Sequence, residues 1–129
     1  MKTGSALNKP RILAVDDEVG FTRLLRLAAS QYEIRTENDA SHVIDAVKEF
    51  KPDLILMDRA MPHISGDQLA AEIKLDPNLG DIPVAFITAI VPHDETGREC
   101  TSLNGCPVLA KPVTIDAIDR CVKNCLKKE

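Results

Sequence analysis

Apolar residues gather in short runs along the chain, and each run leads into a polar or charged residue. The clearest run, Leu54 to Met57, stands between Pro52 and Asp58 and predicts a strand over residues 53–58 that is buried on both faces. Comparable runs predict further strands over residues 11–15, 82–87 and 107–110, and the alternating pattern of residues 32–37 predicts a short strand near the edge of the sheet. Strands buried on both faces are typical of parallel sheets.

The segments between these strands carry apolar residues at helical spacing. Their stripes comprise Phe21, Leu24, Leu25 and Ala28; then Ala40, Val43, Ile44 and Val47; then Leu69 and Ile73; and finally Ile115, Ile118, Val122 and Leu126. Ser65 and Thr114 precede two of the stripes and predict N-terminal caps, as Asn38 or Asp39 does for another. The sequence therefore alternates predicted strands with predicted helices.

One segment departs from this alternation. Residues 91–106 contain Pro92, Gly97 and Gly105, and only Cys100 and Leu103 resemble a buried stripe. We expect a short or irregular helix there, because proline and glycine interrupt helical structure.

Five strands alternating with helical segments predict an α/β fold with helices on both faces of a parallel sheet. We expect the flavodoxin-like (βα)5 arrangement with strand order 2-1-3-4-5. Residues 1–10 are predicted to be a polar N-terminal tail and residues 11–127 a single domain, with no output domain after it.

Composition narrows the classes of protein. The net charge of -4 argues against a nucleic-acid partner, which would require a basic surface. No apolar run approaches the roughly 20 residues of a membrane span, and no secretory signal is found at the N-terminus. We therefore expect a cytoplasmic protein without membrane contact, whose four cysteines are free thiols.

The predicted topology brings several polar side chains together. Asp16 and Asp17 follow the first strand and Asp58 ends the third, and these strands are neighbours at the switch point of the expected order. Thr88 and Lys111 arrive from the fourth and fifth strands at the same edge of the sheet. Two carboxylates about 4 Å apart repel by about 4 kcal/mol at an effective dielectric constant of about 20. The cluster must therefore take up protons, pair with a lysine or bind a metal ion.

The donor set favours Mg²⁺, which prefers a few carboxylate oxygens and keeps several water molecules. Lys111 adds a positive charge that can pair with Asp58 or with a phosphoryl oxygen, and Thr88 adds a hydroxyl donor. A carboxylate nucleophile, a divalent cation, a lysine and a hydroxyl are the parts that phosphoryl transfer needs.

The chain resembles the receiver domains of response regulators in two-component signalling, from Arg11 to about Leu126. The resemblance lies in Asp16-Asp17, Asp58, Met61-Pro62, Gly66, Ile82-Pro83-Val84, Thr88-Ala89 and Lys111-Pro112, all in the family's order and spacing.

This resemblance implies that Asp58 takes a phosphoryl group from a histidine kinase or a histidine phosphotransfer protein. It implies that Asp17, Asp58 and the backbone carbonyl of Ala60 hold Mg²⁺, with Asp16 acting through water. Thr88 and Lys111 would bind the phosphoryl oxygens, and the Lys111-Pro112 peptide would be cis. Such a domain is not a conventional enzyme: it catalyses its own aspartyl phosphorylation and a slow dephosphorylation, and switches its contacts with partners.

The sequence departs from the family in three places. Val108 stands where receivers usually carry Tyr or Phe, three residues before the lysine. Residues 91–106 cover the place of the fourth helix. Ala60 and Ile90, two residues after Asp58 and Thr88, offer no polar side chain to orient a hydrolytic water molecule.

Other interpretations remain open at this point. The chain could be a docking module that works without phosphorylation, its acidic cluster simply binding a cation, or a receiver fragment of a hybrid histidine kinase. Asp58 taken alone could be a turn residue. Cys121 and Cys125 are one helical turn apart, which suits metal ligands, although buried apolar packing is the commoner role.

Two enzyme classes are disfavoured. A dinucleotide site needs glycines after the first strand, where this chain carries Asp16 and Asp17. A phosphatase of the haloacid dehalogenase type needs a second aspartate at the position of Ala60.

Overall fold

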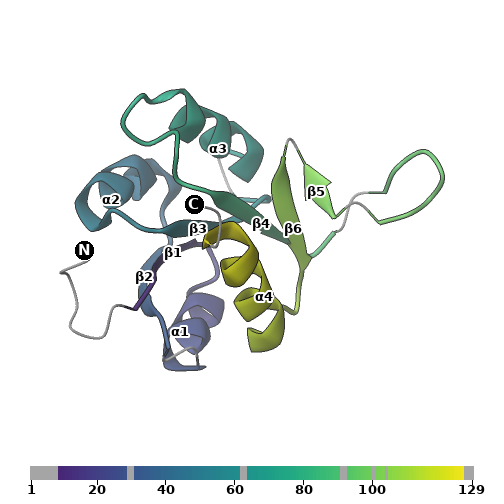
Figure 1. Ribbon diagram of the computed structural model, residues 1–129, viewed down its shortest axis with the longest axis horizontal. Coiled ribbons are helices and arrows are strands. Elements are labelled where there is room, and N and C mark those ends of the chain that lie inside the picture. Colours follow the sequence, from purple (N-terminus) through teal and green to yellow (C-terminus); the bar gives the residue numbers. More distant parts are fainter. Residues whose placement is uncertain are drawn as a thin grey trace.

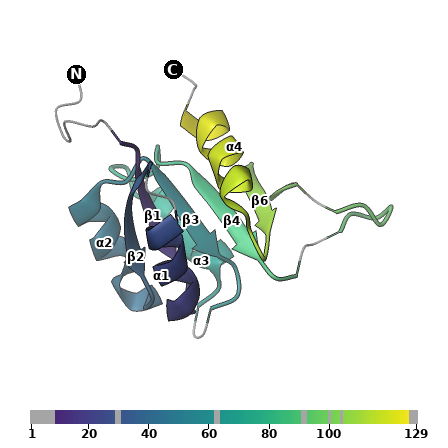
Figure 2. The same cartoon turned by 90° about the horizontal axis from the view of Figure 1, so that it is seen from below.

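The computed structural model describes residues 9–28, 31–61, 64–90, 93–99, 101–103 and 105–126. It shows a central sheet with helices on both faces (Figures 1 and 2). The strands are β1 (Arg11–Val15), β2 (Glu33–Glu37), β3 (Leu54–Asp58), β4 (Val84–Thr88), β5 (Ser102–Leu103) and β6 (Cys106–Ala110). The helices are α1 (Val19–Ala28), a short 3-10 turn at Ala40–His42, α2 (Val43–Phe50), α3 (Gly66–Leu75) and α4 (Ile115–Leu126).

The sheet has the order β2-β1-β3-β4-β6-β5. Strands β2, β1, β3, β4 and β6 are parallel neighbours, so the expected order 2-1-3-4-5 is confirmed with β6 as the fifth parallel strand. The sixth strand, β5, pairs antiparallel with β6 and extends the sheet.

Alternate residues of the central strands point into two separate cores. Leu13 and Met57 belong to the core under α2 and α3, whereas Ala14 and Leu56 belong to the core under α1 and α4. Figure 1 shows the two helix pairs on opposite sides of the sheet. Residues 12–15 of β1 and 54–57 of β3 are continuous apolar runs because both faces of these strands are covered.

Two of the expected helix caps are present, whereas α2 itself has no side-chain cap and the expected Asp39 cap serves the preceding 3-10 turn. The Ser65 hydroxyl accepts a hydrogen bond from the Gln68 amide at 3.1 Å, and the Thr114 hydroxyl accepts one from the Ala117 amide at 3.1 Å. Asp39 caps the 3-10 turn that precedes α2, its carboxylate accepting from the Ser41 amide.

The first helical stripe can be followed only in part. The structure places α1 where it was expected, and Leu25 is buried in the core. The side chains of Phe21, Leu24 and Ala28 lie outside the described residues, as do residues 1–8 of the predicted tail. The domain limits of 11–127 remain a prediction.

The expected short or irregular helix over residues 91–106 is wrong for the described part of that segment. His93 and Glu99 form an antiparallel bridge, and β5 follows. The Asp94 carboxylate accepts hydrogen bonds from the Thr96 and Arg98 amides, closing a turn that competes with helix formation.

Residues 93–99 form a hairpin arm, and Gly97 lies in its turn. Gly97 has a φ of 90°, in the left-handed region that glycine adopts without strain. Figure 2 shows the arm extending away from the body of the domain. Residues 93–99 are accordingly exposed.

In the described part of the chain, no helix has the length and apolar character needed to cross a membrane.

Candidate functional site

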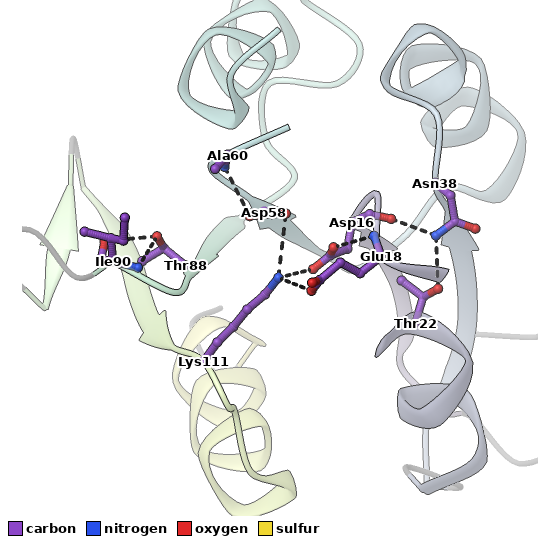
Figure 3. A network of polar contacts seen from close by, with 9 residues as sticks. All are labelled: Asp16, Glu18, Thr22, Asn38, Asp58, Ala60, Thr88, Ile90 and Lys111. Atoms are coloured by element: carbon purple, nitrogen blue, oxygen red, sulfur yellow. Dashed lines mark hydrogen bonds and ion pairs between the residues drawn. The ribbon is translucent and has the colours of Figure 1, made fainter. Parts of the chain in front are cut away.

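The polar residues predicted to meet lie at the carboxyl edge of the sheet. Asp58 and Thr88 are the last residues of β3 and β4, Asp16 and Asp17 directly follow β1, and Lys111 directly follows β6. Because these strands are parallel and adjacent, their carboxyl ends share one edge (Figure 3).

The ammonium group of Lys111 joins the acidic residues of this edge. Its Nζ lies 2.7 Å from Asp16 Oδ2, 3.0 Å from Glu18 Oε1 and 3.7 Å from Asp58 Oδ2. Lys111 therefore contacts Asp16 more closely than Asp58, the partner expected from the sequence. Burial alone lowers the pKa of Lys111, but its contacts with Asp16 and Glu18 outweigh this and raise the pKa.

Asp16 is fully buried and held in place by its neighbours. Its Oδ1 accepts a hydrogen bond from the Glu18 amide at 2.9 Å. The Asn38 side chain donates to the backbone carbonyl of Asp16 at 2.7 Å and to the Thr22 hydroxyl at 3.0 Å. The sequence interpretation missed Glu18 and Asn38 in these roles; the only available signal was their position just after β1 and β2.

Asp58 is also buried, with 4% of its surface exposed. Its Oδ1 accepts a hydrogen bond from the Ala60 amide at 3.1 Å. Burial, followed by the charge of Asp16, raises the pKa of Asp58 from 3.8 to about 6, and the Ala60 hydrogen bond and the Lys111 charge only partly oppose the increase. A carboxylate with this pKa is destabilised by its surroundings and gains from a bound cation.

Asp16, Asp17 and Asp58 form a group that could hold a metal ion. One carboxylate oxygen from each lies within 4.8 Å of the others. Asp17 is exposed while the other two are buried, so an ion could reach the cluster from solvent at the Asp17 side. Three carboxylates open to water on one side fit the requirements of Mg²⁺. The role predicted for the Ala60 carbonyl stays a prediction.

Thr88 does not join this network. Its hydroxyl donates to the Ile90 carbonyl at 3.0 Å and accepts from the Ile90 amide at 3.1 Å (Figure 3). The Lys111-Pro112 peptide is cis, as the resemblance implied. The structure thus brings together the three aspartates and Lys111, while the Thr88 side chain is bonded to its own loop.

Comparison with known families decides the classification. The model of the response regulator receiver domain matches residues 12–123, which is most of the chain. The chain belongs to this family. Its fold, a parallel sheet of order β2-β1-β3-β4-β6 with helices on both faces, is that of a receiver domain.

Curated relatives of several kinds share this domain. The chain is 33% identical over 119 residues to the polar-differentiation response regulator DivK of Brucella anthropi, a match that covers 89% of this chain and 94% of DivK. It is 39% identical over 82 residues to the response regulator PleD of Caulobacter vibrioides, covering 62% of this chain and 18% of PleD. A hybrid signal transduction histidine kinase of Dictyostelium discoideum is 32% identical over 83 residues, which is 64% of this chain and 5% of that kinase.

Solved structures have the same fold. The Vibrio cholerae chemotaxis protein CheY4 superimposes with a TM-score of 0.77 at 20% identity, covering 92% of this chain and 99% of that one. A response regulator from Chloroflexus aurantiacus gives a TM-score of 0.75 at 24% identity, covering 94% and 100% of the two chains. At these identities the likeness concerns the fold alone.

Two departures of this receiver domain are visible in the structure. Val108 lies on β6, paired with Phe86 of β4, and packs partly buried against the core under α2 and α3. Ala60 and Ile90 are both exposed and line a small cavity together with Thr88. The family's aromatic position is therefore an aliphatic packing residue here.

The cysteines give no sign of a metal site. Cys121 is buried in the core under α1 and α4, and burial raises the pKa of its thiol to about 12. Cys106 is buried on the opposite face, and Cys100 lies outside the described residues. Within the part of the chain that can be described, the aspartate cluster is the only group of three or more such ligands.

Proposed function

We propose that this receiver domain accepts a phosphoryl group on Asp58 from a phosphohistidine of a histidine kinase or histidine phosphotransfer protein. The observation that carries the proposal is the buried Asp58 carboxylate at the end of β3, with its Oδ2 3.7 Å from Lys111 Nζ and within the aspartate cluster. The raised pKa of Asp58 supports it, because perturbed carboxylates in such clusters are candidates for chemistry.

The reaction forms one bond and breaks another. A carboxylate oxygen of Asp58 attacks the phosphorus, the bond from phosphorus to the imidazole nitrogen breaks, and the histidine leaves as neutral imidazole after taking up a proton. The product is an aspartyl phosphate on Asp58. Catalysis here consists of positioning the acceptor and balancing charge on the transferred group.

A bound metal ion would be held by the carboxylates of Asp17 and Asp58 and by the backbone carbonyl of Ala60. Asp16 would act through a water molecule. Mg²⁺ at this position would neutralise the carboxylates and the charge that develops on the phosphoryl oxygens. The exposure of Asp17 and the burial of Asp16 support this division of roles, since the exposed carboxylate is accessible to an incoming hydrated ion.

Lys111 and Thr88 would bind the phosphoryl oxygens after transfer. For Lys111 this requires movement from Asp16 and Glu18 toward Asp58. For Thr88 it requires breaking both hydrogen bonds to Ile90. Phosphorylation would therefore alter the segment that leads from β4 into the hairpin, which supports a role in switching contacts with a partner protein.

The test uses acetyl phosphate as a small donor with Mg²⁺ and intact-protein mass spectrometry. The parent chain should gain one phosphoryl group, Asp58→Asn should gain none, and the exposed Asp45→Asn should behave as the parent. Labelling that persists in Asp58→Asn would refute the acceptor assignment. Absence of labelling and of beryllofluoride binding in the parent would favour the phosphorylation-independent docking module.

The relatives suggest in which kinds of protein this receiver domain would work. DivK is nearly matched by this chain in length, whereas PleD and the hybrid kinase are far longer than the matched segment. We propose a cytoplasmic phosphorelay component, acting alone or as the receiver of a longer regulator or hybrid histidine kinase. Its partners would be the phosphodonor protein and one downstream protein.

A further inference from the structure

A second cavity opens beside the acidic cluster, between α2 and α3. It has a volume of about 650 Å³, within the range of small-molecule clefts. Its apolar wall is formed by Ile44, Met61, Ile64 and Leu69. The first three are only partly buried and pack against the core, so apolar surface faces this space.

The polar lining of the cavity carries one sign of charge. Asp17, Asp39 and Glu72 contribute carboxylates, and no Lys, Arg or His is found among the described residues that line the cavity. Asp39 already accepts hydrogen bonds from the Ser41 amide and hydroxyl, and its Oδ2 lies 3.7 Å from His42 Nδ1. Among the described residues, neither Asp17 nor Glu72 takes part in an ion pair. The cavity therefore offers negative charge beside an apolar wall.

From this combination we propose that the cavity binds a small organic cation with an apolar stem, such as an aralkylammonium or alkylguanidinium compound. The apolar stem would lie against Ile44 and Leu69, and the cationic group would face the carboxylate of Glu72. Burial of the stem supplies affinity, and the acidic groups select the cation over a neutral or anionic analogue.

The cavity is distinct from the phosphoryl-transfer centre but touches it. Asp17 belongs to both, and Asn38, which also lines the cavity, donates to the Asp16 backbone carbonyl. Glu72 on α3 and Ile44 on α2 belong to the cavity alone. Substitutions at Glu72 and Ile44 can therefore test the cavity without removing a residue of the phosphoacceptor machinery.

The probe is 2-phenylethylammonium, titrated into the full chain with saturating Mg²⁺ and followed by amide chemical shifts. The bound Mg²⁺ keeps the probe from acting as a substitute ion in the aspartate cluster. Neutral 2-phenylethanol and anionic 3-phenylpropionate serve as comparison probes of similar shape. We expect the ammonium compound to bind, the alcohol to bind about threefold more weakly, and the carboxylate not to bind.

Two variants and a control localise the site. Glu72→Gln should weaken binding of the ammonium probe by about threefold, while leaving the alcohol unchanged. Ile44→Gln should weaken both probes, because it places an amide on the apolar wall. Glu95→Gln, an exposed acidic residue in the hairpin arm, should have no effect. Both cavity variants should still take up a phosphoryl group from acetyl phosphate, which separates this proposal from the proposed phosphoacceptor function.

The proposal is overturned if the ammonium and the alcohol bind equally, or if Glu72→Gln and Glu95→Gln have the same effect. It is also overturned if the free amine fails to bind while a short peptide, acetyl-Leu-Lys-Leu-amide, binds and shifts the cavity amides. That result would assign the cavity to a basic segment of a partner protein.

Discussion

The ammonium group of Lys111 lies 2.7 Å from the fully buried carboxylate of Asp16. The same group is 3.7 Å from Asp58, so the lysine charge neutralises Asp16 more strongly than the Asp58 carboxylate. This imbalance agrees with the pKa of Asp58, which burial and then Asp16 raise to about 6.

The stability of the metal-free domain should decrease as pH rises from about 4 to about 6. Asp58 has a pKa of about 6 when folded and 3.8 as its ordinary value, so the native state binds more protons between these values. The free energy of unfolding then falls with increasing pH, by on the order of 2 kcal/mol across the window. Urea denaturation in EDTA at several pH values measures it.

Asp58→Asn supplies the control, because it removes the titrating group and should flatten this part of the profile. Asp16→Asn should lower the pKa of Asp58, since it removes a neighbouring negative charge and releases Lys111. A pH profile of Asp58→Asn that matches the parent would show that another group causes the effect.

Mg²⁺ affinity should fall more on Asp17→Asn than on Asp16→Asn. A direct ligand loses a metal bond when its charge is removed, whereas Asp16 is buried against Lys111 and would act through water. Titration of Mg²⁺ by calorimetry should show a loss of about tenfold or more for Asp17→Asn. Equal losses, or a larger loss for Asp16→Asn, would exchange the two roles.

The aspartyl phosphate should be long-lived. Ala60 and Ile90 line the small cavity beside Thr88, and neither can orient a water molecule by a polar side chain. The double variant Ala60→Asn, Ile90→Glu should lose phosphate faster, by about tenfold, in a phosphate-release assay. Ala60→Val with Ile90→Leu is the matched control without a polar side chain and should decay as the parent does. An unchanged decay rate in the first variant would show that these positions do not limit hydrolysis.

Beryllofluoride with Mg²⁺ should slow amide exchange in residues 89–106. The phosphoryl mimic would draw the Thr88 hydroxyl away from Ile90, and this rearranges the chain that enters the hairpin. The arm over residues 93–99 is exposed and has few buried contacts, so a small difference in affinity suffices to shift it. Val108 provides no ring that could rotate with it. Exchange that changes only on the α1 and α2 surfaces would place the response elsewhere.

The parallel sheet, its strand order and most of the helices could be predicted from the sequence. Continuous apolar runs such as Leu54–Met57 occur because both faces of the strand are covered, and the stripe of α4 repeats at helical spacing for the same reason. The cluster of Asp16, Asp17 and Asp58 could also be predicted, because parallel order alone brings the carboxyl ends of β1 and β3 together.

The hairpin was not predictable in the same way. Proline and glycine in residues 91–106 indicate only that a helix is weak there, and they do not specify what replaces it. The hairpin that replaces the helix depends on the hydrogen bonds of the Asp94 turn and on the pairing of β5 with the edge of β6. Edge pairing is a contact between segments, so it becomes visible only when the sheet is assembled.

The sequence by itself determined which groups meet at the edge of the sheet, because strand direction and strand order follow from local apolar patterning and crossover geometry. Only the tertiary structure decided how those groups pair. Lys111 contacts Asp16 more closely than Asp58, and Thr88 bonds to Ile90, because ion pairs and hydrogen bonds depend on differences of about an ångström in side-chain position that no residue pattern records.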